Sequence, residues 1–402
     1  MTRLYRLLWQ DRTLRLVALA MLLHGSFASS VGTYQSLIAV TIFDLSDNTY
    51  ALVLLASLTV SVAASIGVGI LTDQRPSRRV LALCAAATMC GGALLVLAGH
   101  SAPVFIVAHI FLLPVTGTIF GQLFAVARLV IAPLPRADRD GLMAIIRAVF
   151  ALPFMLLLGL WGAAFDAGLP LIAVYGWTTL CGATLMALIW FNWPRDAEAP
   201  WTEIKSGLNF RASLAEMTQA PVLLRVLLVG AIHSGSALAG VVVGLLLNAV
   251  PGRGAGDVGL FFAGFVAIEV IVTLLIGQLR HLFRRLYIIA AGVFIYASFL
   301  ALLPLLASGP GLWLLIVPAG AGGALVYALA IGYLQDLLGS RAGAGSSLLA
   351  LQQIAAQGLS ALIFAIGAAV GGYALVPALG AVAMSAAMVA ILLLDRNAPL
   401  EI

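Results

Sequence analysis

Long runs of uncharged, mostly apolar residues dominate this sequence and constrain its fold more than any other feature. Charged residues make up only 9% of the 402 residues, whereas a soluble domain carries roughly a quarter. A hydrocarbon core ~30 Å thick is crossed by about 20 helical residues. The runs therefore predict an all-α membrane protein with many spans and exclude a soluble fold. They cover residues 16–43, 48–72, 80–127, 148–165, 167–194, 226–252, 258–279, 286–335 and 342–394.

Three of these runs are too long for one crossing, and each contains a turn signal. Glycine and proline residues cluster at 99–103 and at 308–311, and a Gly-Gly pair lies within 371–373. Dividing the runs at these points predicts twelve transmembrane helices.

Basic residues predict the orientation of the spans. When the loops are placed alternately, 17 of the 21 basic residues fall on the side of the N-terminus, and only Arg253 faces the other side. Cytoplasmic loops carry the excess of basic residues, so both termini are expected in the cytoplasm. The first 16 residues hold four arginines and no small-residue cleavage site, so we expect an interfacial helix there rather than a signal peptide.

Charge is densest between the sixth and seventh spans, in residues 193–220. We interpret this segment as a cytoplasmic linker between two six-helix halves, residues 1–192 and 221–402. Internal repeats of this kind are typical of transporters, whose site lies near the midplane between the halves. The pattern Gly-x-Leu ends the second and fourth spans of both halves, at Gly69, Gly121, Gly277 and Gly332.

Several function classes find no support in the sequence. There is no P-loop, so ATP is not expected as the energy source, and no nucleophile elbow, so enzyme activity is not expected. Cys84, Cys90 and Cys181 lack metal-ligand spacing, so we expect no metal site. The net charge of +5 is attributed to cytoplasmic loops rather than to nucleic-acid binding.

The loop after the second span reads GILTDQRPSRRVL and begins at Gly69. It resembles the cytoplasmic signature of the major facilitator superfamily, G-x-L-x-D followed by basic residues. Gly69 allows close helix approach, and Asp73 can oppose the positive N-terminal end of a neighbouring helix. In the superfamily that neighbour is span eleven, which begins here near Arg341. The conformational motif is assigned to Gly69, Asp73, Arg78, Arg79, Asp336 and Arg341.

This signature departs from the superfamily pattern in three places. Pro76 stands where glycine is usual, Gln74 where a basic residue is usual, and His281 where the second half would have an aspartate. Only the first-half contact is therefore expected to be strong. The alternative interpretation is an ordinary charged cytoplasmic loop.

Two further segments, GQLFAVAR from Gly121 and QDLLGSRAGA from Gln335, together with Arg147 and Glu269, resemble the sugar efflux transporter (SET) family. Their order and spacing fit over most of the chain, although literal similarity is confined to short segments. The resemblance implies proton-coupled export of small sugars, such as lactose, glucose and related glycosides, through the bacterial inner membrane.

Glu269 is the strongest candidate for a proton carrier. It lies eleven residues from the start and ten from the end of the run 258–279, hence ~15 Å from either surface. A charge at that depth costs about 2.5–3.5 kcal/mol, so such residues normally face a cavity and mark an ion or substrate path. Burial also disfavours the charged form of a carboxyl group, which permits proton exchange. The alternative is a structural glutamate bonded to a neighbouring helix.

Arg147 is the expected partner of Glu269. It enters the fifth span by about one and a half turns, and in the superfamily spans five and eight face each other. We hypothesise that Arg147 holds Glu269 ionised in one conformation and releases it in the other. The alternative is that Arg147 extends to the cytoplasmic surface. Arg128, on the last turn of span four, is expected to anchor that helix end.

A sugar presents hydroxyl groups, which amides bind, and an apolar ring face, which aromatic side chains bind. Gln353 and Gln357 lie one turn apart on one face of span eleven. Each membrane glutamine has the alternative role of fastening helices together. His233, near the middle of span seven, is a further ligand or proton relay unless it is satisfied locally. The predicted substrate residues are Tyr34, Gln35, Gln122, Phe124, His233, Tyr327, Gln353 and Gln357, with Trp161 as another possible ring face.

These observations predict a twelve-helix major facilitator fold that exports small sugars in exchange for protons by alternating access. The expected partners are a sugar, protons and the lipid bilayer, with no cofactor and no nucleic acid, and the chain is expected to act as a monomer. A drug or metabolite exporter of the same fold is the first alternative. A non-transporting membrane scaffold or sensor is the second.

Overall fold

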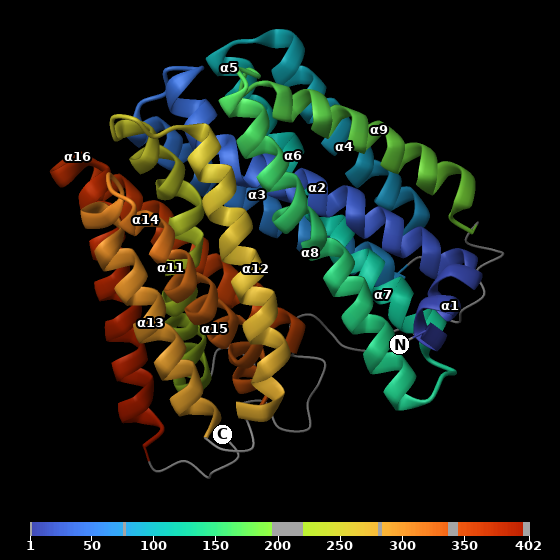
Figure 1. Ribbon diagram of the computed structural model, residues 1–402. Coiled ribbons are helices and arrows are strands. Elements are labelled where there is room, and N and C mark those ends of the chain that lie inside the picture. Colours follow the sequence, from blue (N-terminus) through green and yellow to red (C-terminus); the bar gives the residue numbers. More distant parts are fainter. Residues whose placement is uncertain (1, 75–77, 195–219, 280–283, 337–344, 397–402) are drawn as a thin grey trace. The chain divides into compact units, whose positions relative to one another are not determined.

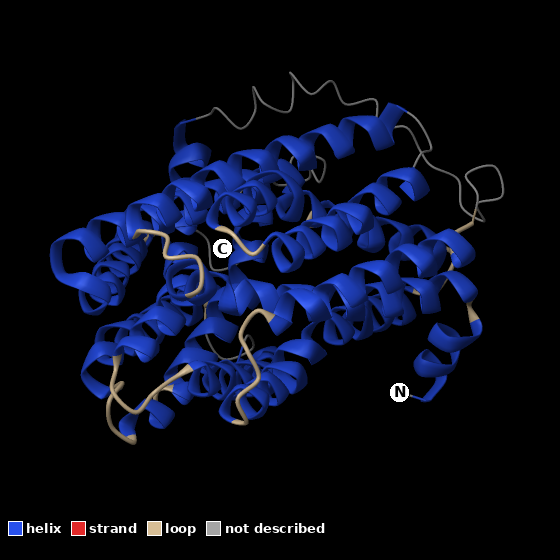
Figure 2. Cartoon of the chain, turned by 90° about the horizontal axis from the view of Figure 1, so that it is seen from above, coloured by secondary structure: helices blue, strands red, loops and turns tan. Residues whose placement is uncertain are grey.

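Every regular element that the computed structural model describes is a helix (Figure 1, Figure 2). Ten helices in the described part of the chain are long and apolar enough to cross a membrane. The chain divides into two compact units, residues 1–45 with 56–206 and residues 46–55 with 207–402. The described residues are 2–74, 78–194, 220–279, 284–336 and 345–396.

Unit 1 contains the helices of the first half of the chain, and α3 is shared with unit 2 because its first residues, up to Leu55, cluster there. The helices are α1 (Thr2–Gln10), α2 (Arg12–Thr41), α3 (Asp47–Gln74), α4 (Arg78–Gly99), α5 (Ala102–Val107), the π-helical turn η1 (Ala108–Leu112), α6 (Leu113–Thr116), α7 (Thr118–Ile131), α8 (Arg136–Asp166) and α9 (Ala173–Asn192).

Asp11 separates the short helix α1 from the first long helix. Its carboxylate accepts hydrogen bonds from the backbone N–H groups of Thr13 and Leu14, both at 2.8 Å, and thus forms the N-cap of α2. The expectation of one interfacial helix over the first 16 residues is therefore wrong in extent. The separate helix ends at Gln10, because a carboxylate at position 11 starts a new helix.

The predicted fourth span is one continuous path of α5, η1, α6 and α7 with a wide turn in it. Pro114 lies two residues after the end of η1 and has no N–H group to donate to the preceding turn. A π-helical turn is a common way to accommodate such a lost bond. The turn predicted at 99–103 is confirmed, since α4 ends at Gly99 and α5 begins at Ala102.

In unit 1, α2 packs against α7, α8 and α9, and α4 packs along α9. The contact between α4 and α9 needs a glycine, because a Cβ atom at Gly182 would lie 2.7 Å from the backbone of Cys90. At the other end of the same pair, Arg79 donates a hydrogen bond of 2.8 Å to the carbonyl oxygen of Trp190. Both contacts hold α4 close to α9 and build the apolar core of the unit.

Unit 2 contains the remaining helices and the start of α3. The turn predicted at 308–311 is confirmed, since α13 ends at Leu306 and α14 begins at Gly311. The helices are α11 (Ala220–Ala249), α12 (Ala255–Leu279), α13 (Arg285–Leu306), α14 (Gly311–Leu314), α15 (Ile316–Asp336) and α16 (Gly345–Leu394).

The helical path of α16 is interrupted near its middle. Gly371 has φ −141° and ψ 16°, and Gly372 has φ 66° and ψ −168°, neither of which is helical. A positive φ at Gly372 is strained for any residue with a side chain. The turn predicted at 371–373 is therefore confirmed, and α16 consists of two helices joined at this point.

In unit 2, α11 packs along α16, and α15 lies against both α12 and α13. Glycines of α15 permit these two contacts. A Cβ atom at Gly320 would lie 2.5 Å from the carbonyl oxygen of Phe265 on α12, and one at Gly322 would lie 2.6 Å from the backbone nitrogen of Tyr296 on α13. The close approach brings the polar residues of α12, α13 and α15 together.

The start of α3 contacts α16. Asp47 accepts a hydrogen bond of 2.8 Å from the hydroxyl group of Tyr373, and the buried ring of Tyr50 meets that of Phe364 edge-on at 6.0 Å. Residues 46–55 thus cluster with unit 2. The predicted boundaries at 192 and 221 stay predictions, because most of the predicted linker, residues 195–219, lies outside the described residues.

Candidate functional site

Glu269 lies on α12, far from both ends of a mostly apolar helix whose other charged residue, Asp257, lies in the first turn. Its side chain is half-buried and makes no hydrogen bond or ion pair with another residue that the structure describes. The alternative interpretation was a structural glutamate bonded to a neighbouring helix. The described part of the chain shows no such bond. A carboxyl group in this setting is available to exchange a proton or to bind a polar ligand.

Two tyrosine residues lie close enough to Glu269 to interact electrostatically with it. They are Tyr296 on α13 and Tyr327 on α15, and Ser236 on α11 lies near the hydroxyl group of each. Tyr296 is buried, whereas 44% of Tyr327 is exposed. Four helices of unit 2 therefore contribute to one cluster of a carboxyl group and three hydroxyl groups. We call Ser236, Glu269, Tyr296 and Tyr327 the Glu269 cluster.

His233 extends the Glu269 cluster by one residue. Its ring meets that of Tyr327 edge-on, with centroids 5.0 Å apart. The Nδ1 atom lies 2.9 Å from the carbonyl oxygen of Val229, which can only accept, so Nδ1 carries the hydrogen and Nε2 is the acceptor of the neutral ring. One ring nitrogen of His233, Nδ1, is therefore satisfied by a hydrogen bond within its own helix. The sequence predicted both His233 and Tyr327 as substrate residues, and the structure brings these two together.

Among the predicted residues of unit 1, Tyr34 is fully buried. Its ring contacts that of Phe165 edge-on at 5.0 Å, and Phe165 stacks on Trp161 at 5.4 Å. The indole nitrogen of Trp161 donates a hydrogen bond of 2.8 Å to the hydroxyl group of Ser30. In this conformation both ring faces pack inside the protein, and their role as sugar platforms stays a prediction.

Gln122 on α7 is buried, and neither atom of its amide group has a hydrogen-bond partner among the described residues. Such a group costs about 1–3 kcal/mol when it is left unpaired. Gln35 on α2 is half-buried. A buried amide without a protein partner is suited to binding a polar group, although no part of Gln122 reaches the surface in this conformation.

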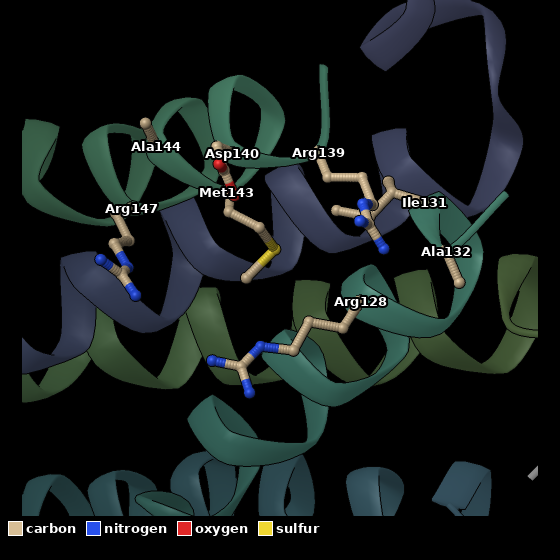
Figure 3. A pocket seen from close by; sticks show the side chains of 8 residues that line it. All are labelled: Arg128, Ile131, Ala132, Arg139, Asp140, Met143, Ala144 and Arg147. Carbon is tan, nitrogen blue, oxygen red and sulfur yellow. The ribbon is translucent and has the colours of Figure 1, made fainter. Parts of the chain in front are cut away.

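Arg147 on α8 is exposed, and its guanidinium group lies over the ring of Phe124 at 5.7 Å. The structure thus brings together two residues of unit 1 that the sequence predicted for separate roles, Arg147 for proton coupling and Phe124 for substrate binding. Figure 3 shows Arg147 beside a pocket between α7 and α8. Glu269 belongs to unit 2, so its pairing with Arg147 stays a prediction.

The two glutamines predicted on one face of span eleven, Gln353 and Gln357, are both exposed on α16. The neighbouring Gln352 is buried instead, and its amide nitrogen has no hydrogen-bond partner among the described residues. The exposure of both Gln353 and Gln357 agrees with their one-turn spacing, which places them on one face of the helix. A role in sugar binding stays a prediction for both.

The residues of the predicted conformational motif are only partly described. A Cβ atom at Gly69 would meet no described atom within 4 Å, and the start of span eleven, its expected neighbour, lies outside the described residues. Arg79 binds Trp190 of α9, as described above, and its guanidinium lies 5.4 Å from the indole ring. Arg341 and the side chains of Asp73 and Asp336 lie outside the described residues, and Arg78 is half-buried at the start of α4.

Sequence reasoning missed two buried polar contacts. Asp395 forms an ion pair with Arg225 and accepts a hydrogen bond from Tyr333. Arg225 and Asp395 both lie just beyond the ends of uncharged runs. A charged residue is ordinary at such a position and does not indicate a buried contact. His109 in η1 pairs with Tyr175 of α9 at 2.7 Å, and the nearby Pro114 was the available signal for the wide turn that holds it.

The described residues contain no group of three or more His, Cys, Asp or Glu side chains that could hold a metal ion. The chemistry of the Glu269 cluster is that of hydrogen bonding and proton exchange. Its hydroxyl groups donate and accept hydrogen bonds, and its carboxyl group does the same when protonated.

No family model matches this chain. A protein of Deinococcus radiodurans described as "Putative sugar efflux transporter" is 28% identical over 366 residues, which cover 89% of this chain and 91% of that protein. The chain is thus similar to a sugar efflux transporter over most of its length. The resemblance to the major facilitator superfamily and its sugar efflux family is thereby confirmed over most of the chain.

Solved transporter structures share the fold. The nucleoside transporter NupG matches with a TM-score of 0.77 and 13% identity, covering 96% of this chain and 100% of that one. An auto-inhibited peptide transporter of the POT family matches with a TM-score of 0.74 and 13% identity, covering 97% and 98%. At such low identity the likeness shows the transporter fold alone.

Proposed function

We propose that this chain exports small sugars, such as lactose, glucose and related glycosides, in exchange for protons. The observation that carries the proposal is Glu269, a half-buried carboxyl group in the middle of an apolar helix, without an ion pair among the described residues. A membrane protein tolerates such a group where water or a substrate reaches it. The sugar efflux relative supports the substrate class.

Twelve spans in two six-helix halves are part of this proposal. Ten candidate spans are supplemented by the break of α16 at Gly371–Gly372, which divides one of them, and by the shorter apolar helix Gly311–Tyr327. The basic loops support a location in the bacterial inner membrane with both termini in the cytoplasm. The chain would act as a monomer, with no cofactor.

In the proposed cycle, the two halves rock about a central site and expose it to one side at a time. Protonation of Glu269 neutralises the charge, which lowers the cost of moving the carboxyl group away from water. Arg147 would hold Glu269 ionised in one conformation and release it in the other. The proton gradient then supplies the energy, because each conformation favours a different protonation state.

The sugar would contact both polar groups and an aromatic ring, because its surface has hydroxyl groups and an apolar ring face. The hydroxyl groups of the Glu269 cluster and the acceptor nitrogen of His233 supply hydrogen bonds. The exposed amides of Gln353 and Gln357 offer both donors and acceptors to neighbouring sugar hydroxyl groups. The partly exposed ring of Tyr327 supplies an apolar face.

A counterflow assay in proteoliposomes tests the substrate class. Vesicles loaded with unlabelled lactose or glucose should take up the labelled sugar, and a pH gradient across the vesicle membrane should drive net uptake. Competition by lipophilic cations but not by sugars would instead indicate a drug exporter of the same fold. Absence of any counterflow, with either class of compound, would indicate a membrane protein that does not transport them.

A further inference from the structure

A pocket of about 470 Å³ lies between α7 and α8 in unit 1 (Figure 3). Three of the residues that line it are arginines, Arg128 on α7 and Arg139 and Arg147 on α8. All three side chains are exposed. The positive charges of the three arginines repel one another, and an anion that enters the pocket relieves this repulsion.

The acidic residues near the pocket neutralise these arginines only in part. Asp140 is the one acidic lining residue, and its carboxylate lies 3.9 Å from Arg136, which does not line the pocket. Asp138, half a turn away, binds Arg3 of α1 at 3.1 Å. The described residues therefore leave the three arginines of the pocket with an excess of positive charge.

Apolar side chains lie between the arginines of the pocket. Met143, whose thioether points into the pocket in Figure 3, and Ile131 are two of them. The pocket thus offers cationic forks with apolar surface between them. Guanidinium groups match the geometry of phosphate oxygens through paired hydrogen bonds.

We propose that the pocket of Arg128, Arg139 and Arg147 binds the phosphate group of a phosphate ester with net negative charge. A phospholipid headgroup and a soluble phosphorylated metabolite share this chemistry, and basic pockets between membrane helices are known to take anionic headgroups. The uncharged sugars of the proposed transport cycle need no such charge. The inference therefore stands whether or not the chain exports sugars, and a ligand in this pocket would occupy the guanidinium group of Arg147.

Thermal unfolding of the full-length protein, followed by tryptophan fluorescence, tests this inference with two probes. The first is glycerol 3-phosphate added to protein in nanodiscs of phosphatidylcholine, with potassium chloride at matched ionic strength as the reference. The second is a change from phosphatidylcholine nanodiscs to nanodiscs that also contain phosphatidylglycerol. We expect a rise of at least about 2 °C in Tm with one or both probes, since a ligand that binds only the folded state stabilises it.

The two arms distinguish the sources of the phosphate. A response to glycerol 3-phosphate assigns the pocket to a soluble phosphate ester, and a response to phosphatidylglycerol alone assigns it to a lipid headgroup. Arg128→Gln and Arg139→Gln should each abolish most of the rise. Arg6→Gln removes the same charge from an exposed position on α1 outside the pocket and should keep the full rise.

Two results would overturn the inference. The first is a wild-type protein whose Tm rises no more with either probe than with its reference. The second is an equal response from Arg6→Gln and Arg128→Gln, because general surface charge would then explain the effect. Arg139→Lys keeps the charge without the planar fork, and a retained but reduced rise in that variant is expected if the glutamine variants fail to fold.

Discussion

The guanidinium group of Arg225 on α11 lies against the carboxylate of Asp395, 170 positions later in the chain, with Nε 3.0 Å from Oδ1. The same carboxylate accepts a hydrogen bond from the hydroxyl group of Tyr333 on α15. The side chains of Arg225 and Asp395 are only 19% and 5% exposed. Three helices of unit 2 are therefore joined by a buried ion pair next to the end of α16.

Replacing Asp395 with alanine should destabilise the protein strongly. The substitution removes the carboxylate that pairs with a guanidinium group only 19% exposed, and breaking comparable pairs costs about 3–5 kcal/mol. Tyr333→Phe removes one hydrogen bond and should cost about 1 kcal/mol. Thermal unfolding in detergent should show a large fall in Tm for the first variant and a small fall for the second.

Asp140→Ala is the matched control for this measurement. Asp140 is 76% exposed and lies 3.9 Å from Arg136, so its loss should change Tm little. Equal Tm values for Asp395→Ala and Asp140→Ala would contradict a stabilising role for the buried pair.

Glu269→Gln should uncouple transport from the proton gradient. Glutamine has nearly the same shape as a protonated glutamate but cannot release a proton. Uptake driven by a pH gradient should therefore fall to background, while exchange between two sugar pools continues. Proteoliposomes with and without a pH gradient measure the two rates separately.

Asp44→Asn makes the same chemical change outside the Glu269 cluster. Asp44 is exposed and has φ 49°, a conformation that asparagine also adopts readily, so the fold and the pH-driven rate should be kept. A pH-driven rate in Glu269→Gln equal to that of Asp44→Asn would eliminate Glu269 as the proton carrier.

Tyr327→Phe should weaken sugar binding more than it slows exchange. The variant keeps the ring that meets His233 but loses the hydroxyl group that the proposed site offers to the sugar. Loss of one hydrogen bond of about 1 kcal/mol corresponds to about a fivefold rise in the KM for counterflow. Tyr287→Phe, an exposed tyrosine on α13, should leave the KM unchanged. A KM that stays constant in both variants would remove Tyr327 from the sugar site.

Cysteine labelling should reveal the orientation of the membrane helices. In a background without Cys84, Cys90 and Cys181, a cysteine at exposed Asn48 should react with an impermeant maleimide in intact cells. A cysteine at exposed Ala132, directly after the end of α7, should react only after the cells are opened. The reverse pattern would contradict the orientation drawn from the basic loops.

The positions of the turns could be predicted because they depend on local sequence. An α-helix cannot continue through Gly372, whose φ is 66°. The helix ends at Gly99 and Leu306 coincide with glycine and proline turn signals that are equally local. The depth of Glu269 also follows from the fixed rise of a helix. The end of α1 at Gln10 was missed because the strength of one capping side chain, Asp11, decided it.

The partners of polar side chains depend instead on which helix faces pack together. Arg225 contacts Asp395 across 170 positions of the chain, and Asp47 contacts Tyr373 across 326 positions. The periodicity within one helix cannot predict such contacts. Burial of Tyr34 and Gln122 was decided in the same way. Hydropathy and helix length are properties of each segment, so the sequence by itself determined a bundle of membrane helices with a carboxyl group at mid-depth. Only tertiary packing decided which hydroxyl groups surround that carboxyl group, because neighbours in space come from different helices.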